Sequence, residues 1–396
     1  MHAATFFDGE GWRDGILELV DGRMLLSDAT PAHDLPRLDG VVVGGFTDHH
    51  VHLQLVDHTL LHGSTLGRVV DLGANPAVIA AYADAARVVS VAGAPSLNER
   101  QDAVPRPHNQ QCDAAPWSLS ERSETKRPHP VAAPWSLSER SETKRPHPVA
   151  APWSLSERSE TKRPHPVAVE FAGAFLTPVG GYPSDRDWAL EGSFREIADT
   201  AAAERAVAEM ADAGASCIKV ASNADAGPVF TDDLCRAIVD AASARGLPIV
   251  THAQGSGEAQ RVARLGVARL AHAPFTERLD DDEIVAQAAS VAWVSTLAIH
   301  DADSAERVTA VDNVRRFHAA GGAMLYGTDM GNGPTPVGLN PNELAALRDA
   351  GITGAALLRT LMPQDPRDPA SVLLRLPGTD AEPTLARPLT SADLKA

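Results

Sequence analysis

The sequence contains few cysteines and no excess of basic residues. Its three cysteines, Cys112, Cys217 and Cys235, are odd in number and widely spaced, so they form neither a zinc motif nor a disulfide framework. Such thiols suit a reducing cytoplasm, which is the location we expect. The 52 acidic residues outnumber 35 lysines and arginines and give a net charge of −17. Because phosphate groups bind to basic surfaces, this balance argues against a nucleic-acid or anionic-membrane partner.

Long apolar runs are also missing. No window approaches about 18 consecutive apolar residues, the length that crosses a membrane. The N-terminus has no basic region followed by an apolar stretch, so we expect neither a membrane segment nor an export signal. The length of 396 residues does not require several domains, because α/β barrels commonly exceed about 200 residues as a single unit.

Three identical copies of one 18-residue block, APWSLSERSETKRPHPVA, occupy residues 115–168. The block is shorter than the repeats of solenoids and propellers, and its prolines confine any helix to a few residues. The stretch before the repeats is also polar. We interpret the repeats and this stretch, residues 88–168, as one disordered insertion. A peptide-binding or oligomerising role is the alternative. The remaining 342 residues outside the repeats carry a net charge of −20.

Outside the insertion, short apolar runs alternate with amphipathic segments over residues 41–362. The runs predict eight strands, at Val41–Phe46, Arg68–Leu72, Val169–Leu176, Ser216–Val220, Leu247–Thr251, Ala268–Ala271, Val291–Thr296 and Ala323–Tyr326. Several of the amphipathic segments end at a glycine, which suits the end of a helix. Eight alternations of strand and helix predict an α/β fold of the (β/α)8 TIM-barrel type. A doubly wound open sheet is the structural alternative.

The two ends of the chain are predicted to form a small β-subdomain beside the barrel. Residues 1–40 contain short strands with Asp-Gly turns at Asp8-Gly9, Asp14-Gly15 and Asp21-Gly22. Residues 363–396 contain one clear strand, Ser371–Leu376, before a tail rich in proline and threonine. The first and last segments therefore supply the N-terminal and C-terminal parts of this subdomain.

Polar residues follow the predicted strands at the end where barrel enzymes carry their functional groups. The first strand leads into His50 and His52, which an extended segment places on one face. Four later strands lead into Lys219, His252, His272 and Asp329. Any one of these has a structural explanation, such as a hydrogen-bonded histidine or a turn-capping aspartate. Six such residues at the same end of the predicted strands indicate a metal site.

At these residues the sequence resembles the amidohydrolase superfamily. GGFTDHHVHL is similar to the first-strand signature, in which Asp-x-His-x-His supplies two ligands. GASCIKVASN, THAQGSGEA and GTDMGN resemble the branch with imidazolonepropionase-like and prolidase-like members. The resemblance covers about residues 40–362 without the insertion. It departs at Ala273, where that branch usually has glycine, and around Asp368–Leu373, where the C-terminal strand signature is altered.

The resemblance implies a divalent metal, with zinc as the expected ion, in one or two copies. Lys219 stands where many members carry a carboxylated lysine that bridges two metals. Asp329 would be the catalytic residue, acting as a proton shuttle while metal-activated hydroxide attacks the substrate carbonyl. The implied ligands of the first metal are His50, His52 and Asp329, and those of the second are His252 and His272, with Lys219 joining them.

The loops that follow the strands are expected to select the substrate. Tyr182, Arg186 and His300 are the candidates for substrate binding. We therefore predict a metal-dependent hydrolase that cleaves an amide or cyclic amide C–N bond in a small molecule. A lactone or ester suits the same chemistry, and a metal-binding scaffold without turnover is the alternative from another class. The sequence leaves a homo-oligomer open.

Overall fold

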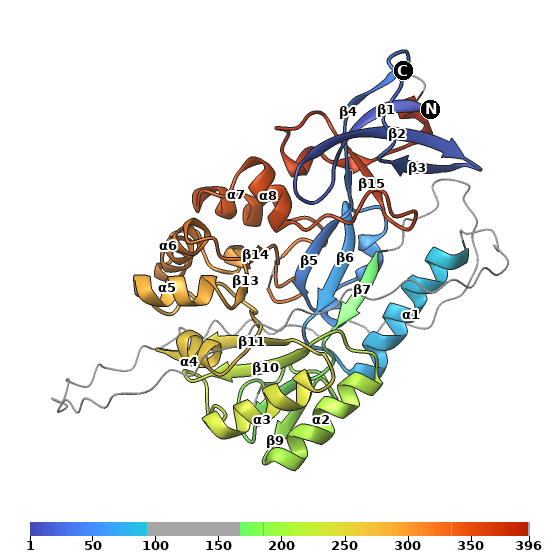
Figure 1. Ribbon diagram of the computed structural model, residues 1–396. Coiled ribbons are helices and arrows are strands. Elements are labelled where there is room, and N and C mark those ends of the chain that lie inside the picture. Colours follow the sequence, from blue (N-terminus) through green and yellow to red (C-terminus); the bar gives the residue numbers. More distant parts are fainter. Residues whose placement is uncertain (93–166, 185, 334, 395–396) are drawn as a thin grey trace. The chain divides into compact units, whose positions relative to one another are not determined.

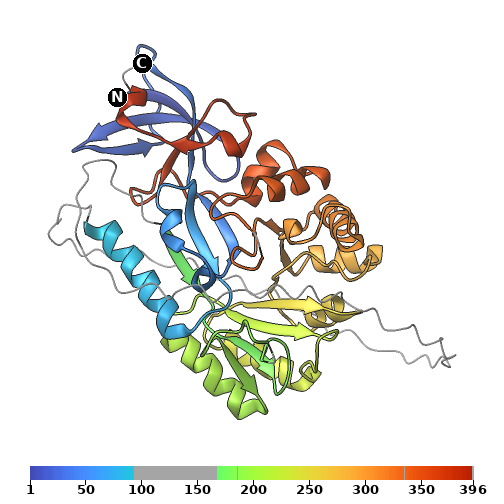
Figure 2. The ribbon, with the colours of Figure 1, turned by 180° about the vertical axis from the view of Figure 1, so that it is seen from behind.

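The structure of the protein is a computed structural model that describes residues 1–92, 167–184, 186–333 and 335–394. Figures 1 and 2 show these residues from two opposite sides. The three repeats, up to residue 166, and most of the predicted insertion lie outside the described residues. Within the range predicted as an insertion, residues 88–92 continue the first α-helix, and Ala168 begins a strand.

One six-stranded sheet contains segments from both ends of the chain (Figure 1). In spatial order its strands are β16 (Arg387–Pro388), β15 (Leu373–Leu376), β4 (Arg37–Gly44), β1 (His2–Phe7), β2 (Trp12–Val20) and β3 (Arg23–Ser27). All neighbours are antiparallel except β1 and β4. This sheet is a β-subdomain with its own cluster of buried hydrophobic residues.

Two parallel sheets follow along the chain. The first contains β5 (Phe46–Val51), β6 (Leu66–Asp71) and β7 (Ala168–Phe171). The second, in spatial order, contains β14 (Met324–Leu325), β13 (Ala292–Val294), β12 (Arg269–Leu270), β11 (Ile249–Gln254), β10 (Ile218–Asn223), β8 (Phe175–Pro178) and β9 (Phe194–Ile197). Every pair of neighbours in these two sheets is parallel.

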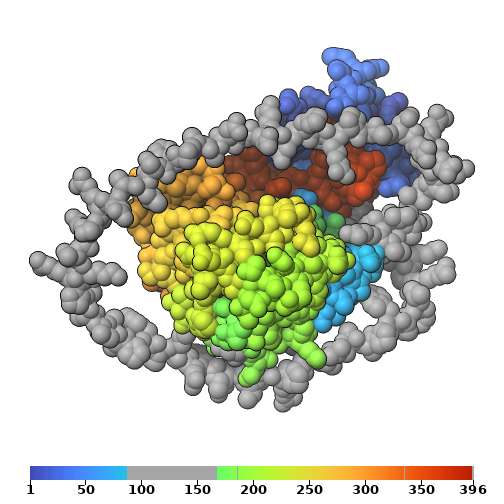
Figure 3. Space-filling model, turned by 60° about the horizontal axis from the view of Figure 1, so that its bottom comes forward, coloured from blue at the N-terminus to red at the C-terminus, as the bar shows by residue number. Residues whose placement is uncertain are grey.

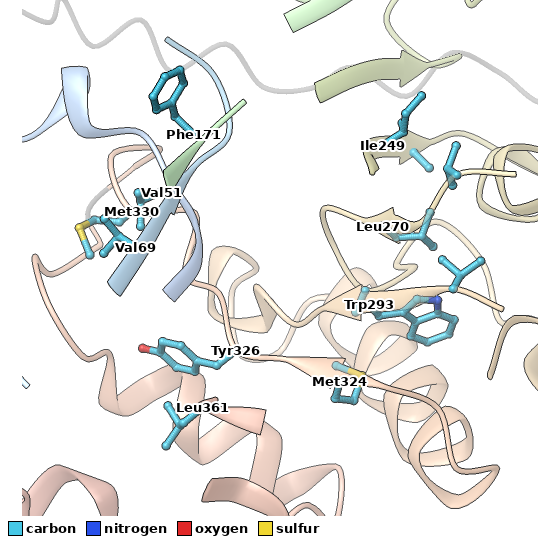
Figure 4. Packing of buried hydrophobic residues seen from close by; sticks show 14 of the residues in the cluster. Val51, Val69, Phe171, Ile249, Leu270, Trp293, Met324, Tyr326, Met330 and Leu361 are labelled. Carbon is cyan, nitrogen blue, oxygen red and sulfur yellow. The ribbon is translucent and has the colours of Figure 1, made fainter. Parts of the chain in front are cut away.

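Backbone contacts join the two parallel sheets at both edges. The Ser216 N–H donates to the Phe171 carbonyl at 2.8 Å, which links β7 to the start of β10. At the other edge the His49 N–H donates to the Tyr326 carbonyl at 2.9 Å, and Val51 pairs with Met330. Figure 4 shows Val51 and Met330 together with Val69 at this junction. The arrangement is a TIM-barrel-like α/β fold.

Helices follow the strands and lie outside them (Figures 1 and 2). The described α-helices are α1 (Pro76–Ala92), α2 (Thr200–Asp212), α3 (Asp232–Ser243), α4 (Glu258–Arg264), α5 (Asp281–Ala288), α6 (Ala305–Ala319), α7 (Pro341–Asp349) and α8 (Gly354–Thr360). Short 3-10 helices are η1 (Leu53–Leu55), η2 (His58–Leu61), η3 (Leu297–Ile299), η4 (Pro383–Leu385) and η5 (Ser391–Leu394). Among the described residues, no helix combines the length and the apolar character needed to cross a membrane.

Local sequence signals explain several helix boundaries. Asp199 and Thr231 each accept a hydrogen bond from the backbone N–H three residues later, at the starts of α2 and α3. Gly214 and Gly246 follow the ends of the same helices with positive φ angles, a conformation that favours glycine. The two helices pack against each other, and Figure 3 shows their segments side by side on the surface.

The main hydrophobic core lies between the strands and the surrounding helices. Trp293 of β13 stacks on Phe317 of α6, with ring centroids 3.8 Å apart and planes 7° from parallel. The indole N–H of Trp293 donates to Gln287 Oε1 of α5 at 2.9 Å, which satisfies its only polar atom. This packing fixes the strands whose ends carry the candidate functional residues.

The predicted first barrel strand, Val41–Phe46, is wrong. Its residues 41–44 end β4 of the β-subdomain, and the barrel strand is β5, which begins at Phe46. The reason is that β4 is buried on both faces. Val42 packs in the subdomain cluster, whereas Val41 and Val43 pack in the main core. A strand buried on both sides has the continuous apolar run that is typical of a parallel barrel strand.

Two further expectations differ from the structure. The predicted third strand, Val169–Leu176, is divided into β7 and β8, because Gly173 between them has a φ of +77°. The Asp14-Gly15 pair does not form a turn but lies inside β2, where a Cβ on Gly15 would stand 2.2 Å from the Ser27 carbonyl oxygen. Here glycine allows a close approach of two strands, which the Asp-Gly pattern does not reveal.

Candidate metal centre

The end of β5 carries two of the predicted ligands, His50 and His52, both buried. Asp48 fixes their backbone. Its Oδ1 accepts hydrogen bonds from the His50 N–H at 3.0 Å and the Thr328 N–H at 3.2 Å, and its Oδ2 accepts from the Thr328 hydroxyl at 2.6 Å. Asp48 thus ties the first barrel strand to the segment before Asp329. In the sequence, Asp48 is recognisable only as part of the first-strand signature, and no local pattern indicates its contacts with Thr328.

Asp329 faces both of these histidines. Its Oδ1 lies 3.1 Å from His50 Nε2 and 3.0 Å from His52 Nε2. Its Oδ2 accepts a hydrogen bond from Asn332 Nδ2 at 2.8 Å. The residue is buried and has a φ of +54°, a left-handed conformation that is uncommon outside glycine. Strained backbone of this kind is concentrated at functional sites.

The outer ring nitrogens of the two histidines contact backbone carbonyls. His50 Nδ1 lies 2.8 Å from the Ala271 oxygen, and His52 Nδ1 lies 3.3 Å from the Gly73 oxygen. Because a carbonyl only accepts, each Nδ1 carries the proton in these contacts. A neutral ring then presents the lone pair of Nε2 to Asp329 Oδ1, which is itself an acceptor. Asp329 Oδ1 has no hydrogen-bond partner among the described residues.

Burial controls the charges in this cluster. It lowers the pKa of His50 well below its usual range, so this ring is neutral at pH 7. For His52 burial acts in the same direction, but Asp329 outweighs it and raises the pKa. Burial would raise the pKa of Asp329, yet the adjacent histidines hold it well below its usual range. The cluster therefore combines the Asp329 carboxylate with the neutral His50 ring, which are ligands of zinc-type cations. The raised pKa of His52, by contrast, favours its protonated form when no cation is bound.

His272 approaches the same point from the end of β12. Its ring centroid lies 4.8 Å from that of His50, and its Nδ1 lies 2.9 Å from the Thr296 hydroxyl. One ligand atom from each of His50, His272 and Asp329 lies within 4.8 Å of the others. Burial lowers the pKa of His272 well below its usual range.

Lys219 and His252 lie beside this group but outside it. His252 is next to His272, with ring centroids 4.8 Å apart, and its Nε2 lies 3.3 Å from Gln254 Oε1. Burial lowers the pKa of His252 to about 4. Lys219 is buried, with its Nζ 5.8 Å from the centroid of the Phe175 ring. Burial lowers the pKa of Lys219 to about 8, although Asp329 opposes the shift.

The three candidates for substrate binding lie on two sides of the histidines. The Tyr182 ring centroid is 5.3 Å from that of His252, and the Arg186 guanidinium carbon is 5.8 Å from the Tyr182 centroid. His300 packs against Phe275 with centroids 4.6 Å apart, and Phe275 in turn lies 6.4 Å from His272. Phe275 and Phe175 were not predicted from the sequence, because only polar residues indicated a functional site there.

Residues 167–359 match the model of the Amidohydrolase family. This part of the chain, slightly less than half of it, is similar to the amidohydrolase family. The match supports a hydrolase that acts on C–N bonds, the enzyme class expected from the sequence. The matched range contains Lys219, His252, His272 and Asp329. His50 and His52 precede this range, on the other side of the segment outside the described residues.

Solved structures of hydrolases share this amidohydrolase fold. A Xaa-Pro dipeptidase with bound methionine is 16% identical, covers 91% of this chain and 86% of its own, and has a TM-score of 0.56. The A. niger ochratoxinase is 12% identical, with coverage of 98% and 94% and a TM-score of 0.58. Molinate hydrolase is 12% identical, with coverage of 96% and 89% and a TM-score of 0.56. No curated protein sequence matches the chain. At these identities the likeness establishes the fold.

Proposed function

We propose that this protein is a metal-dependent enzyme that cleaves the amide bond of a small molecule bearing a carboxylate. One observation supports a bound metal. In their favoured protonation states His50 Nε2 and Asp329 Oδ1 are both acceptors, yet they lie 3.1 Å apart in a buried site. Without a cation this contact is repulsive. Two ligands of a tetrahedral ion at about 2.1 Å lie roughly 3.4 Å apart, so the spacing suits a shared divalent ion.

The residues divide between two cation positions. His50, His52 and Asp329 would hold the first ion, and zinc is the ion we expect from imidazole and carboxylate donors. His252 and His272 would hold a second ion, with Lys219 as a carboxylated ligand between the two. Only a neutral amine reacts with CO2, and the lowered pKa of Lys219 favours that form.

The metal, when bound, lowers the pKa of a water molecule and polarises the substrate carbonyl. The chain's own contribution is proton transfer and orientation. Asp329, which is anionic in the buried site, accepts the proton of the attacking water and returns it to the leaving nitrogen. The bond from Asn332 to its Oδ2 keeps the carboxylate turned toward His50 and His52. Burial of Asp329, His50 and His52 excludes competing water and strengthens their electrostatic interactions.

The substrate class follows from the residues beside His252. Arg186 stacks above Tyr182, and a guanidinium is suited to binding a carboxylate through two hydrogen bonds. A substrate carboxylate at Arg186 would leave its amide carbonyl directed past Tyr182 toward the histidines. His300 with Phe275 would contact the other side of the substrate. The Xaa-Pro dipeptidase among the structural neighbours acts on molecules of this kind, which supports N-acyl amino acids and dipeptides as first candidates.

Metal analysis combined with a substrate panel tests the proposal. The panel contains dipeptides, N-acyl amino acids, cyclic amides and lactones, and each protein is assayed after its metal content is measured by mass spectrometry. We expect at least one transition-metal ion per chain and a loss of about 100-fold or more in turnover for His50→Ala and Asp329→Asn, as for removal of a group that acts in the transition state. The exposed His62→Ala is the matched control and should behave as wild type.

Two outcomes would contradict the proposal. Wild-type protein that retains less than about one metal ion per chain, with no change on His50→Ala, would remove the metal centre. Turnover of lactones alone would keep the centre but replace the amide substrate.

A further inference from the structure

Glu343 is a buried carboxylate that the proposed centre does not use. It lies on α7, is fully buried, and its Oε2 accepts a hydrogen bond from the Ala298 N–H at 2.6 Å. Its Oε1 has no hydrogen-bond partner among the residues that the structure describes. Burial raises the pKa of Glu343 above its ordinary value because a charge is costly in a buried site, so the contact that this carboxyl group makes requires an explanation.

The contact holds a strained turn. Ala298 belongs to η3, and the residue directly before η3 is Thr296, which has a φ of +42°. A β-branched residue in this left-handed region is a genuine outlier, and it persists only where its surroundings impose it. The Thr296 N–H donates to the Gly327 carbonyl at 3.0 Å, and Glu343 holds the Ala298 N–H two residues later. The strained residue is thus fixed on both sides.

The conformation of Thr296 matters because its hydroxyl lies 2.9 Å from His272 Nδ1. A partner on the outer nitrogen of a metal-binding histidine sets the tautomer and the orientation of the ring. His272 contributes one of the ligand atoms that converge with those of His50 and Asp329. Two hydrogen bonds and one strained residue therefore connect the carboxylate on α7 with a proposed metal ligand.

We infer that Glu343 is a positioning residue of the metal centre, which holds η3 so that the Thr296 hydroxyl stays on His272 and supports metal binding. The inference rests on the proposed function, because it concerns a ligand of the proposed ion. A purely structural carboxylate would tie α7 to the barrel and affect only stability. A positioning residue changes the metal affinity through His272 and depends on Thr296.

Zinc affinity, measured by competition with a chelator on metal-free protein of the full chain, separates these roles. Glu343→Leu and Thr296→Val should each raise the zinc Kd about 10- to 100-fold, the usual effect of removing an outer partner of a ligand. The double variant should be no weaker than the weaker single variant, because both changes break one connection. Glu343→Gln keeps an oxygen acceptor for Ala298 and should retain most of the affinity. Glu343→Ser has a polar side chain too short to reach the Ala298 N–H and should raise the zinc Kd as Glu343→Leu does, so it covers the case that Glu343→Leu does not fold.

Gln287→Leu is the matched control. Gln287 is a buried polar residue on α5 that bonds Trp293 at 2.9 Å instead of η3, so its loss should reduce stability without changing the zinc Kd. Additive effects in the double variant would overturn the inference while leaving the metal centre intact. So would a zinc Kd equal to that of Gln287→Leu in Glu343→Leu, or in Glu343→Ser if Glu343→Leu does not fold.

The tautomer of His272 gives a second readout that needs no metal. In metal-free protein with 15N-labelled histidine, His272→Ala identifies the ring signal of this residue. We expect Thr296→Val and Glu343→Leu to alter that signal in the same way. An unchanged signal in Glu343→Leu would overturn the inference. If wild-type protein binds no zinc, the proposed function fails, and this readout alone decides whether Glu343 positions His272.

Discussion

The chemistry of the centre depends on which nitrogen of each imidazole carries its proton. His50 and His52 each direct Nδ1 to a backbone carbonyl, and this contact turns Nε2 toward Asp329. The residues that impose this arrangement are not themselves ligands. Asp48 fixes the backbone of His50 through three hydrogen bonds shared with Thr328, and it is completely buried. Residues without contact to substrate are therefore expected to matter nearly as much as the proposed ligands.

Replacing Asp48 by alanine tests this dependence. The change leaves three buried donors without an acceptor, at about 1 to 3 kcal/mol for each unsatisfied group, so we expect the free energy of unfolding to fall by about 3 kcal/mol or more. Urea unfolding of the metal-free protein measures it. Asp365→Ala is the matched control. Asp365 also accepts a hydrogen bond from the backbone N–H two residues later, but it is exposed, so water replaces the lost acceptor. Equal effects of the two variants would show that Asp48 is dispensable.

Lys219 provides a pH-dependent prediction. Its pKa of about 8 means that the charged form dominates below pH 8 and the neutral, CO2-reactive form above it. The neutral fraction should rise from about 3% at pH 6.5 to about 75% at pH 8.5 by simple titration. We therefore expect carboxylation of metal-free protein to increase over this interval at constant CO2 pressure, as measured by 13C NMR with 13CO2. The signal should vanish in Lys219→Met, and a carbamate signal that persists in this variant would contradict the assignment.

At the scale of strands and helices, the sequence predicted the barrel better than its boundaries. Alternating apolar and amphipathic segments reflect burial, and this pattern was sufficient to predict β10 and β11, which contain Lys219 and His252. The same signal misplaced the first barrel strand, because Val41–Gly44 is buried between two cores. Contacts between distant segments leave no local pattern. For this reason the bonds from Asp48 to Thr328 and from Glu343 to Ala298 were not predictable from the sequence.

The junction of β4 and β5 is where the β-subdomain joins the barrel, and glycine is required there. A Cβ on Gly44 would stand 1.9 Å from the Gln364 carbonyl oxygen, which belongs to the backbone and has no rotamer to change. Gly44→Ala should therefore lower the free energy of unfolding by about 1 to 3 kcal/mol, as overpacking does. In Gly11→Ala no atom lies within 4 Å of the added Cβ, and we expect a change within about 0.5 kcal/mol. Thermal unfolding followed by circular dichroism compares the stabilities of the two variants. Equal melting temperatures would refute the packing argument.

For the whole chain, the connections decide where the repeat segment attaches. It joins the end of α1 to the start of β7. The proposed ligands lie at or after the ends of β5, β12 and β14 and, for Lys219 and His252, within β10 and β11. In a barrel of parallel strands, an α-to-β connection is attached at the face opposite the strand ends that carry function. We therefore expect the proposed centre not to depend on the repeats.

Removing two of the three repeats tests that independence. Because the copies are identical, deleting residues 115–150 leaves the sequence at both junctions unchanged and keeps the residues that lead into β7. Halving the length of a loop changes the free energy of closing it by only about 0.6 kcal/mol, so we expect the melting temperature to move by no more than a few degrees. Metal content and turnover of the best substrate should equal those of the full chain. A deletion variant that folds with the same melting temperature but loses its metal would show that the repeats contribute to the centre.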